Sequence, residues 1–244
     1  MVSASAFDPL DLTGLRLFLD TADVTVWADW LPVGIFYGVT TNPTLLQRAG
    51  VRCTVPSLRD LAMRAFDFGA AEVQLQTWGG ETDALVATGR ELAAIDRRVV
   101  VKVPITRAGV AAGVRLVAGG ARITLTGAYA AHQALTAAAA AADYVAPYLG
   151  RMNDAGRDGH DQIVAMEEML DQMGSPMRVL VASLRSLDDV VRLARRGVDT
   201  FTISPALAGA LFDEPLTEGA VSVFEEAARA MGETAARSSG GDGA

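Results

Sequence analysis

Lysine is almost absent from this sequence, which contains one lysine, Lys102, and 20 arginines. A solvated surface position would accept arginine, so the single lysine indicates a place that requires an amine. Lys102 lies in residues 99–105, a run that is apolar on both faces and typical of a buried parallel strand. We expect burial to lower the lysine pKa and to make the free amine a nucleophile toward carbonyl carbons. A buried structural ion pair with a carboxylate is the alternative.

Cysteine and net positive charge are lacking as well. Cys53 is the single cysteine, so no internal disulfide forms, and it has no histidine partner in the local sequence that would favour a nucleophilic thiol. The net charge of −8 argues against binding to nucleic acid or acidic membranes. No apolar segment approaches the length of a membrane span, and residues 1–14 do not resemble a signal peptide. We therefore expect a cytoplasmic location.

Patterns for metals and nucleotides are also missing. His132 falls on a predicted helix and is expected at the surface, while His160 lies near three aspartates in a segment, 153–161, that is expected to be a solvated loop. Their spacing fits no metal-ligand template. No glycine-rich phosphate loop of the dinucleotide or Walker type follows any predicted strand. The spacing therefore predicts no metal site, and the missing phosphate loop weakens the case for a doubly wound open sheet.

The pattern that is present alternates short apolar strands with helices. The predicted strands cover residues 15–20, 38–43, 72–77, 99–105, 122–126, 143–148, 177–183 and 200–205. Eight such units in 244 residues predict an α/β protein with a single (β/α)8 TIM barrel, and a doubly wound open sheet is the alternative. We expect an N-terminal extension over 1–14, the barrel domain over 15–236 and a flexible tail over 237–244.

Polar side chains stand at or near the end of every predicted strand. They are Asp20, Asn42, Gln76, Lys102, Thr126, Tyr148, Ser183 and Ser204. In a barrel these strand ends converge on one mouth, where active sites are built. This convergence favours the catalytic interpretation of Lys102 over the structural ion pair.

Five of these segments, taken together, resemble the transaldolase family. They are residues 18–22 (FLDTA), 38–43 (GVTTNP), 100–104 (VVKVP), 144–148 (YVAPY) and 181–183 (VAS), and the resemblance covers roughly residues 15–230 in order. It implies that Lys102 forms an imine with a ketose and that Asp20 is the base for the departing aldehyde. It also implies that Thr40 and Asn42 hold donor hydroxyls. The structural alternatives are a helix cap for Asp20, although Thr21 or Asp23 could cap instead, and a simple turn at Asn42.

Two branches of the family carry different residues at the positions that correspond to 76 and 146–148 in this sequence. Transaldolases proper carry a glutamate on the third strand and Ser-Pro-Phe on the sixth, whereas this chain has Gln76 and Ala146-Pro147-Tyr148. The chain is in this respect similar to fructose-6-phosphate aldolases, in which Gln76, Thr126 and Tyr148 would hold a proton-transferring water and Ala146 would lie beside the substrate. Gln76 could instead fill a polar layer of the barrel, and Tyr148 could serve packing alone.

The resemblance further implies that Arg151 and Ser183 bind a substrate phosphate, unless Arg151 is merely solvated. It implies a class I aldolase that needs no cofactor and no metal, acting on sugar phosphates and on small aldehydes and ketones. A transaldolase and a catalytically silent sugar-phosphate-binding barrel are the alternatives. A homo-oligomer, a pentamer or decamer, is implied as well. Trp78 and the 153–161 segment flank the mouth and depart from the family pattern, which leaves the identity of the substrate open.

Overall fold

The computed structural model describes residues 14–239. The expected extension therefore lies outside the described residues apart from Gly14, and so does the expected tail beyond Ser239. Contacts between Cα atoms divide the chain into Met1–Leu207 and Ala208–Ala244. No helix in residues 14–239 is both long and apolar enough to cross a membrane.

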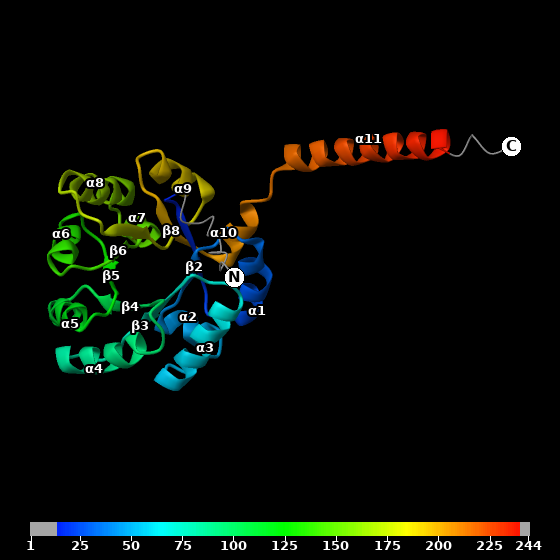
Figure 1. The fold of residues 1–244 in the computed structure, drawn as a ribbon. Coiled ribbons are helices and arrows are strands. Elements are labelled where there is room, and N and C mark those ends of the chain that lie inside the picture. Colours follow the sequence, from blue (N-terminus) through cyan, green and yellow to red (C-terminus); the bar gives the residue numbers. More distant parts are fainter. Residues whose placement is uncertain (1–13, 240–244) are drawn as a thin grey trace, which may run out of the picture. The chain divides into compact units, whose positions relative to one another are not determined.

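Eight parallel strands within the described residues close a barrel in chain order, because each strand pairs with the next and β8 pairs with β1 (Figure 1). The strands are β1 (Arg16–Asp20), β2 (Gly38–Thr40), β3 (Glu72–Gln76), β4 (Val99–Pro104), β5 (Ile123–Ala128), β6 (Tyr144–Pro147), β7 (Arg178–Val181) and β8 (Thr200–Ile203). The closed barrel confirms the predicted fold class and excludes the open sheet.

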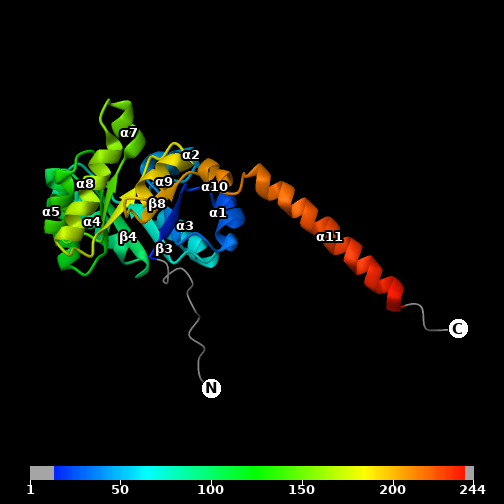
Figure 2. The ribbon, with the colours of Figure 1, turned by 90° about the horizontal axis from the view of Figure 1, so that it is seen from above.

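Helices connect successive strands and surround the barrel (Figures 1 and 2), and two further helices follow the last strand. They are α1 (Val24–Trp30), the 3₁₀ helix η2 (Leu31–Val33), α2 (Pro43–Arg48), α3 (Val55–Asp67), α4 (Thr82–Ala93), α5 (Arg107–Ala118), α6 (His132–Ala139), α7 (Leu149–Asp154), α8 (Gly159–Gln172), α9 (Leu187–Ala194), α10 (Pro205–Ala210) and α11 (Pro215–Ser239). The predicted loop over 153–161 is wrong in part, since Asn153 and Asp154 end α7 and α8 begins at Gly159. Leu149 and Met152, three residues apart and buried, give α7 its apolar face.

Local sequence explains how the helices next to the barrel mouth begin. Asp23 accepts a hydrogen bond from the Thr25 amide at the start of α1, so the capping role belongs to Asp23 and not to Asp20. Ser186 and Asp189 form a capping box at the start of α9.

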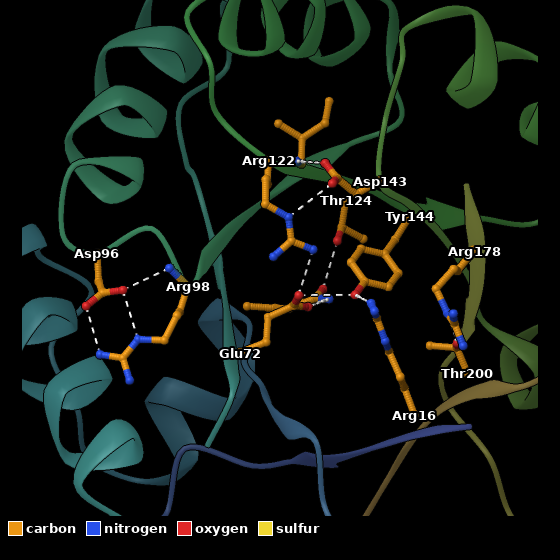
Figure 3. Close-up of polar contacts among 12 residues, drawn as sticks. Arg16, Glu72, Asp96, Arg98, Arg122, Thr124, Asp143, Tyr144, Arg178 and Thr200 are labelled. Carbon is orange, nitrogen blue, oxygen red and sulfur yellow. Dashed lines mark hydrogen bonds and ion pairs between the residues drawn. The ribbon is translucent and has the colours of Figure 1, made fainter. Parts of the chain in front are cut away.

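A basal cluster of one tyrosine and three charged side chains lies near the N-terminal ends of the strands (Figure 3) and consists of Arg16, Glu72, Arg122 and Tyr144. Glu72 is fully buried, and its Oε2 lies 2.8 Å from Nη2 of Arg122 and accepts a 3.1 Å hydrogen bond from the Tyr144 hydroxyl. Arg16 donates to the same tyrosine oxygen at 2.5 Å. The buried charge at this end of the barrel is therefore paired, which identifies the cluster as structural.

Candidate active site

A pocket of about 510 Å³ lies at the C-terminal ends of the strands. Its polar lining consists of Asp20, Asn42, Thr44, Arg48, Lys102, Tyr148, Arg151, Ser183, Arg185 and Ser204. Six of the ten predicted site residues are among them. Active sites of TIM barrels are built at this end, so the pocket is the candidate active site.

Lys102, on β4, forms part of the pocket wall while only 2% of its surface is exposed. Among residues 14–239 its amine makes no hydrogen bond and no ion pair, in contrast to the paired carboxylate of Glu72 at the other end of the barrel. The structural ion pair considered for Lys102 is therefore not found in this part of the chain.

Asp20, at the end of β1, also lines the pocket and is otherwise enclosed by protein. Burial raises the pKa of its carboxyl above the ordinary value, while the positive charge of Lys102 and a hydrogen bond from Thr40 act in the opposite direction. Thr40 donates that hydrogen bond from Oγ1 to Oδ1 of Asp20 over 2.8 Å. Because the Thr40 proton is thus engaged, the Thr202 hydroxyl 2.5 Å away is the donor to Thr40. Two buried threonines therefore hold the carboxylate in place.

Asn42 is the N-cap of α2, and its Oδ1 accepts hydrogen bonds from the amides of Thr44 and Leu45 at 3.0 and 3.1 Å. Asn42 thus has the local structural role that was considered as the alternative to substrate binding. Because Oδ1 is engaged by the helix, Nδ2 is the side-chain atom available to a pocket ligand. Asn42 can therefore cap the helix and donate to a substrate oxygen at once.

Tyr148 and Thr126 meet across β5 and β6, with their hydroxyl oxygens 3.0 Å apart. Gly127, at a φ of 78°, follows Thr126 where the register between the two strands shifts. Gln76 pairs with Lys102 in the register of β3 and β4, and neither Gln76, Thr126 nor Thr40 belongs to the pocket lining. Ala146 is also absent from the lining and is buried in the core of the barrel. These four predicted residues are therefore not part of the pocket lining.

The cationic side of the pocket carries Arg151 from α7 and Ser183 and Arg185 from the segment after β7. The Arg151 guanidinium lies 5.0 Å from the centre of the Tyr148 ring and donates to the Tyr129 hydroxyl over 3.4 Å. Arg151 is therefore not merely solvated. Its exposed side chain borders the pocket and contacts two tyrosines. Guanidinium groups and a hydroxyl are suited to a phosphate ester.

Gly150 lets the segment after β7 approach α7 closely. Its amide donates to the Ser183 carbonyl over 2.8 Å, and a Cβ on this glycine would lie 2.5 Å from that oxygen and 2.4 Å from Nε of Arg185. Ser183 itself has a φ of 59°, an uncommon conformation for a residue with a side chain. Contacts with α7 and α9 therefore hold the backbone that presents Ser183 and Arg185.

In addition to Thr44, three residues of this site were not predicted from the sequence. Arg48 and Arg185 line the pocket, and Tyr129 packs edge-on against Tyr148 with ring centres 5.7 Å apart. Arg185 follows Ser183 by two residues and Arg48 ends the helix that Asn42 caps, so position along the chain was the available signal. In a chain with 20 arginines that signal is weak.

The two histidines differ in their surroundings. His132 begins α6 and is exposed, which confirms the prediction. The prediction of a solvated His160 is wrong: this residue lies on α8, and its largely buried ring is 3.1 Å from the carboxylate of Asp189. No group of three or more His, Cys, Asp or Glu side chains suited to a metal ion occurs in residues 14–239.

Comparison with known proteins identifies the family of this chain. The family profile described as "Transaldolase/Fructose-6-phosphate aldolase" matches residues 17–239. The chain belongs to this family. Its members include the "Probable transaldolase" of Caulobacter sp. (strain K31), which is 38% identical over 210 residues covering 86% of this chain and 94% of that protein. A protein of the same name from Thermus thermophilus is 35% identical over 216 residues, covering 87% and 97%.

Solved structures of lower sequence similarity share the fold alone. Thiamine phosphate pyrophosphorylase from Pyrococcus furiosus superposes with a TM-score of 0.54 at 16% identity, covering 80% of this chain and 88% of that one. A mandelate oxidase mutant superposes with a TM-score of 0.55 at 16% identity, covering 80% and 66%. The family assignment supports an aldolase- or transaldolase-type activity.

Proposed function

We propose that the protein is a class I aldolase that cleaves, and in reverse forms, fructose 6-phosphate or a related ketose phosphate. The observation that carries this proposal is the state of Lys102: the single lysine of the chain is buried in the pocket wall, and its amine has no ion-pair partner among the described residues. Such an amine is suited to attack the ketose carbonyl and form an imine with loss of water.

The imine acts as an electron sink for carbon–carbon cleavage. Asp20 accepts the proton of the C4 hydroxyl, the bond between C3 and C4 breaks, and its electron pair moves toward the cationic nitrogen to leave an enamine. The C4 fragment departs as glyceraldehyde 3-phosphate. The position of Asp20 in the pocket and its hydrogen bond from Thr40 support the assignment of this base.

Release of the three-carbon fragment requires a proton on C3 of the enamine, followed by hydrolysis of the imine to free dihydroxyacetone. We assign proton delivery to Tyr148, through a water held by Tyr148, Thr126 and Gln76. The 3.0 Å contact between the Tyr148 and Thr126 hydroxyls supports this group as a unit, and the strand register places Gln76 directly beside Lys102 on the neighbouring strand. Arg151, Ser183 and Arg185 bind the phosphate of the substrate in this proposal.

A transaldolase is the second candidate function. The names of the curated relatives favour it, since each of those reported above is called a probable transaldolase. In that reaction the enamine is not protonated and instead attacks a second aldehyde. The glutamine at position 76 and the tyrosine at position 148 favour the aldolase, because a hydroxyl can pass a proton to the enamine.

Reductive trapping tests the imine directly. Because the chain holds one lysine, the N-terminal amine is the only other amine that borohydride could couple to dihydroxyacetone. We expect one three-carbon adduct, mapped to Lys102 by peptide mass spectrometry, and no such adduct in Lys102→Arg. A folded protein that gives no adduct on Lys102 would contradict the proposal and favour the silent barrel.

A further inference from the structure

His160 occupies a buried position between α8 and α9 that the proposed reaction does not use. It is the second residue of α8, and 15% of its side chain is exposed. Its Nε2 is buried and lies 3.1 Å from Oδ1 of Asp189 on α9. This contact is an ion-pair distance and does not have hydrogen-bond geometry, and no hydrogen-bond partner for this nitrogen is found in residues 14–239. The contact with Asp189 is therefore the one polar interaction that His160 Nε2 makes in this part of the chain.

Asp189 connects that contact to the segment before α9. Its second oxygen, Oδ2, accepts hydrogen bonds from the amides of Ser186 at 3.1 Å and Arg185 at 3.3 Å. Its side chain is 14% exposed, so its orientation is set by protein groups more than by water. One carboxylate thus joins the ring of His160 on one side to the backbone at Arg185 and Ser186 on the other.

The backbone that Asp189 holds belongs to the turn of residues 183–186, which brings Ser183 and Arg185 to the pocket. On its other side this turn is held by α7, through the 2.8 Å hydrogen bond from the Gly150 amide and a 2.7 Å ion pair between Arg185 and Asp154. Ser183 has a positive φ, a conformation that persists where the surrounding structure holds it. The turn therefore depends on fixed contacts from both α7 and α9.

We propose that His160 is a positioning residue for the phosphate-binding side of the pocket. It fixes Asp189, Asp189 fixes the amides of Arg185 and Ser186, and the turn then holds the Ser183 hydroxyl and the Arg185 guanidinium where one phosphate group can meet both. This inference rests on the proposed function, because that function assigns the phosphate to these two side chains. His160 itself does not line the pocket that contains Lys102.

Removal of the imidazole is expected to loosen the turn without destroying it. In His160→Ala, Asp189 keeps its two backbone hydrogen bonds and the contacts with α7 remain. The effect should therefore be confined to ligands that carry a phosphate. A substitution that acted through general loss of packing would weaken phosphorylated and unphosphorylated ligands alike.

The test compares His160→Ala with His160→Gln, whose amide can donate to Asp189, and with His132→Ala as a matched control on the exposed histidine. Glycerol 3-phosphate is the binding probe, measured by titration calorimetry, which requires no turnover. We expect His160→Ala to weaken its binding roughly tenfold, the size of effect typical when one supporting interaction is lost. His160→Gln should recover most of that loss, and His132→Ala should bind like the unsubstituted protein.

Kinetics in the synthetic direction give a second readout. With dihydroxyacetone as donor, His160→Ala should raise KM for glyceraldehyde 3-phosphate by a similar factor while kcat, and KM for unphosphorylated glyceraldehyde, change less than about twofold. Equal changes for both aldehydes, or unchanged glycerol 3-phosphate binding, would overturn the inference. If His160→Ala does not fold, phosphorylated and unphosphorylated ligands are compared in His160→Gln and His160→Asn instead, and the same outcomes support or overturn the inference.

Failure of this inference is distinguishable from failure of the proposed reaction. If the unsubstituted protein binds no glycerol 3-phosphate, the phosphate site is wrong and the role of His160 falls with it. If binding behaves as expected while borohydride traps no adduct on Lys102, the positioning role stands and the imine chemistry is wrong.

Discussion

Replacement of Tyr148 by phenylalanine tests the step that separates an aldolase from a transaldolase. The change removes one oxygen and leaves the ring, which packs edge-on against Tyr129 at 5.7 Å and lies under the Arg151 guanidinium at 5.0 Å. The lost structural contact is one hydrogen bond with the Thr126 hydroxyl, worth about 0.5–1.5 kcal/mol. The variant should therefore fold and still bind substrate.

The expected loss of activity is larger and is confined to one step. General acid catalysis contributes about 10²–10⁴-fold, which corresponds to roughly 2.7–5.4 kcal/mol at 1.36 kcal/mol for each factor of ten. We expect release of free dihydroxyacetone to fall by about 10²-fold or more. Formation of glyceraldehyde 3-phosphate in the first turnover should fall less than about tenfold, because Asp20 and Lys102 carry that step.

Rapid-quench measurements of both products per active site distinguish these steps. Tyr129→Phe is the matched control, since it also removes a phenolic oxygen but one that contacts Arg151 and not Thr126. Equal losses of first-turnover aldehyde and of released ketone in Tyr148→Phe would refute the role assigned to the Tyr148 hydroxyl.

Three further predictions concern pH and stability. Thr40→Val removes the hydrogen bond that lowers the pKa of Asp20, so the acid limb of the kcat profile should move to higher pH. Burial and nearby carboxylates raise the pKa of Glu167 to about 7, so its protonated form is favoured in the folded state. Stability linked to Glu167 should fall as pH rises from about 4.3 to 7, and Glu167→Gln should flatten that part of the Tm profile. Glu72→Gln removes one of the two carboxylates paired with Arg122, while Asp143 remains, and should cost about 1–3 kcal/mol of unfolding free energy in urea titrations.

Matched variants control these three experiments. Thr40→Ser keeps a hydroxyl and should retain the original acid limb. Glu168→Gln changes an exposed neighbour of Glu167 and should leave the Tm profile as it was. Asp83→Asn breaks an exposed ion pair with Arg115 and should change stability by less than about 1 kcal/mol. An unshifted acid limb in Thr40→Val, an unchanged Tm profile in Glu167→Gln, or a small effect of Glu72→Gln would each contradict the corresponding argument.

The barrel could be predicted from the sequence because its strands are buried on both faces. Residues 99–103 are apolar apart from Lys102, and in such a run a single polar residue is conspicuous. The polar residues at the strand ends could be predicted to converge for the same reason, since all parallel strands of a barrel end at one mouth. Asp20, Asn42, Lys102 and Ser183 do line one pocket.

Features that depend on contacts between helices could not be predicted in this way. The burial of His160 results from the packing of α8 against α9, which no local pattern around Gly159 reveals. The polar and glycine-containing segment 153–161 resembles a loop, although its first residues continue α7. The contact of Tyr129 with Tyr148 requires the path of the chain after the register shift at Gly127.

The central claim is that the enamine formed on Lys102 is protonated and released. The most direct test is to count glyceraldehyde 3-phosphate released from fructose 6-phosphate, per active site, with no acceptor aldehyde present. We predict many turnovers, with dihydroxyacetone released in equal amount. A burst near one equivalent that then stalls would contradict it, because the three-carbon unit would be waiting for an acceptor, as in a transaldolase.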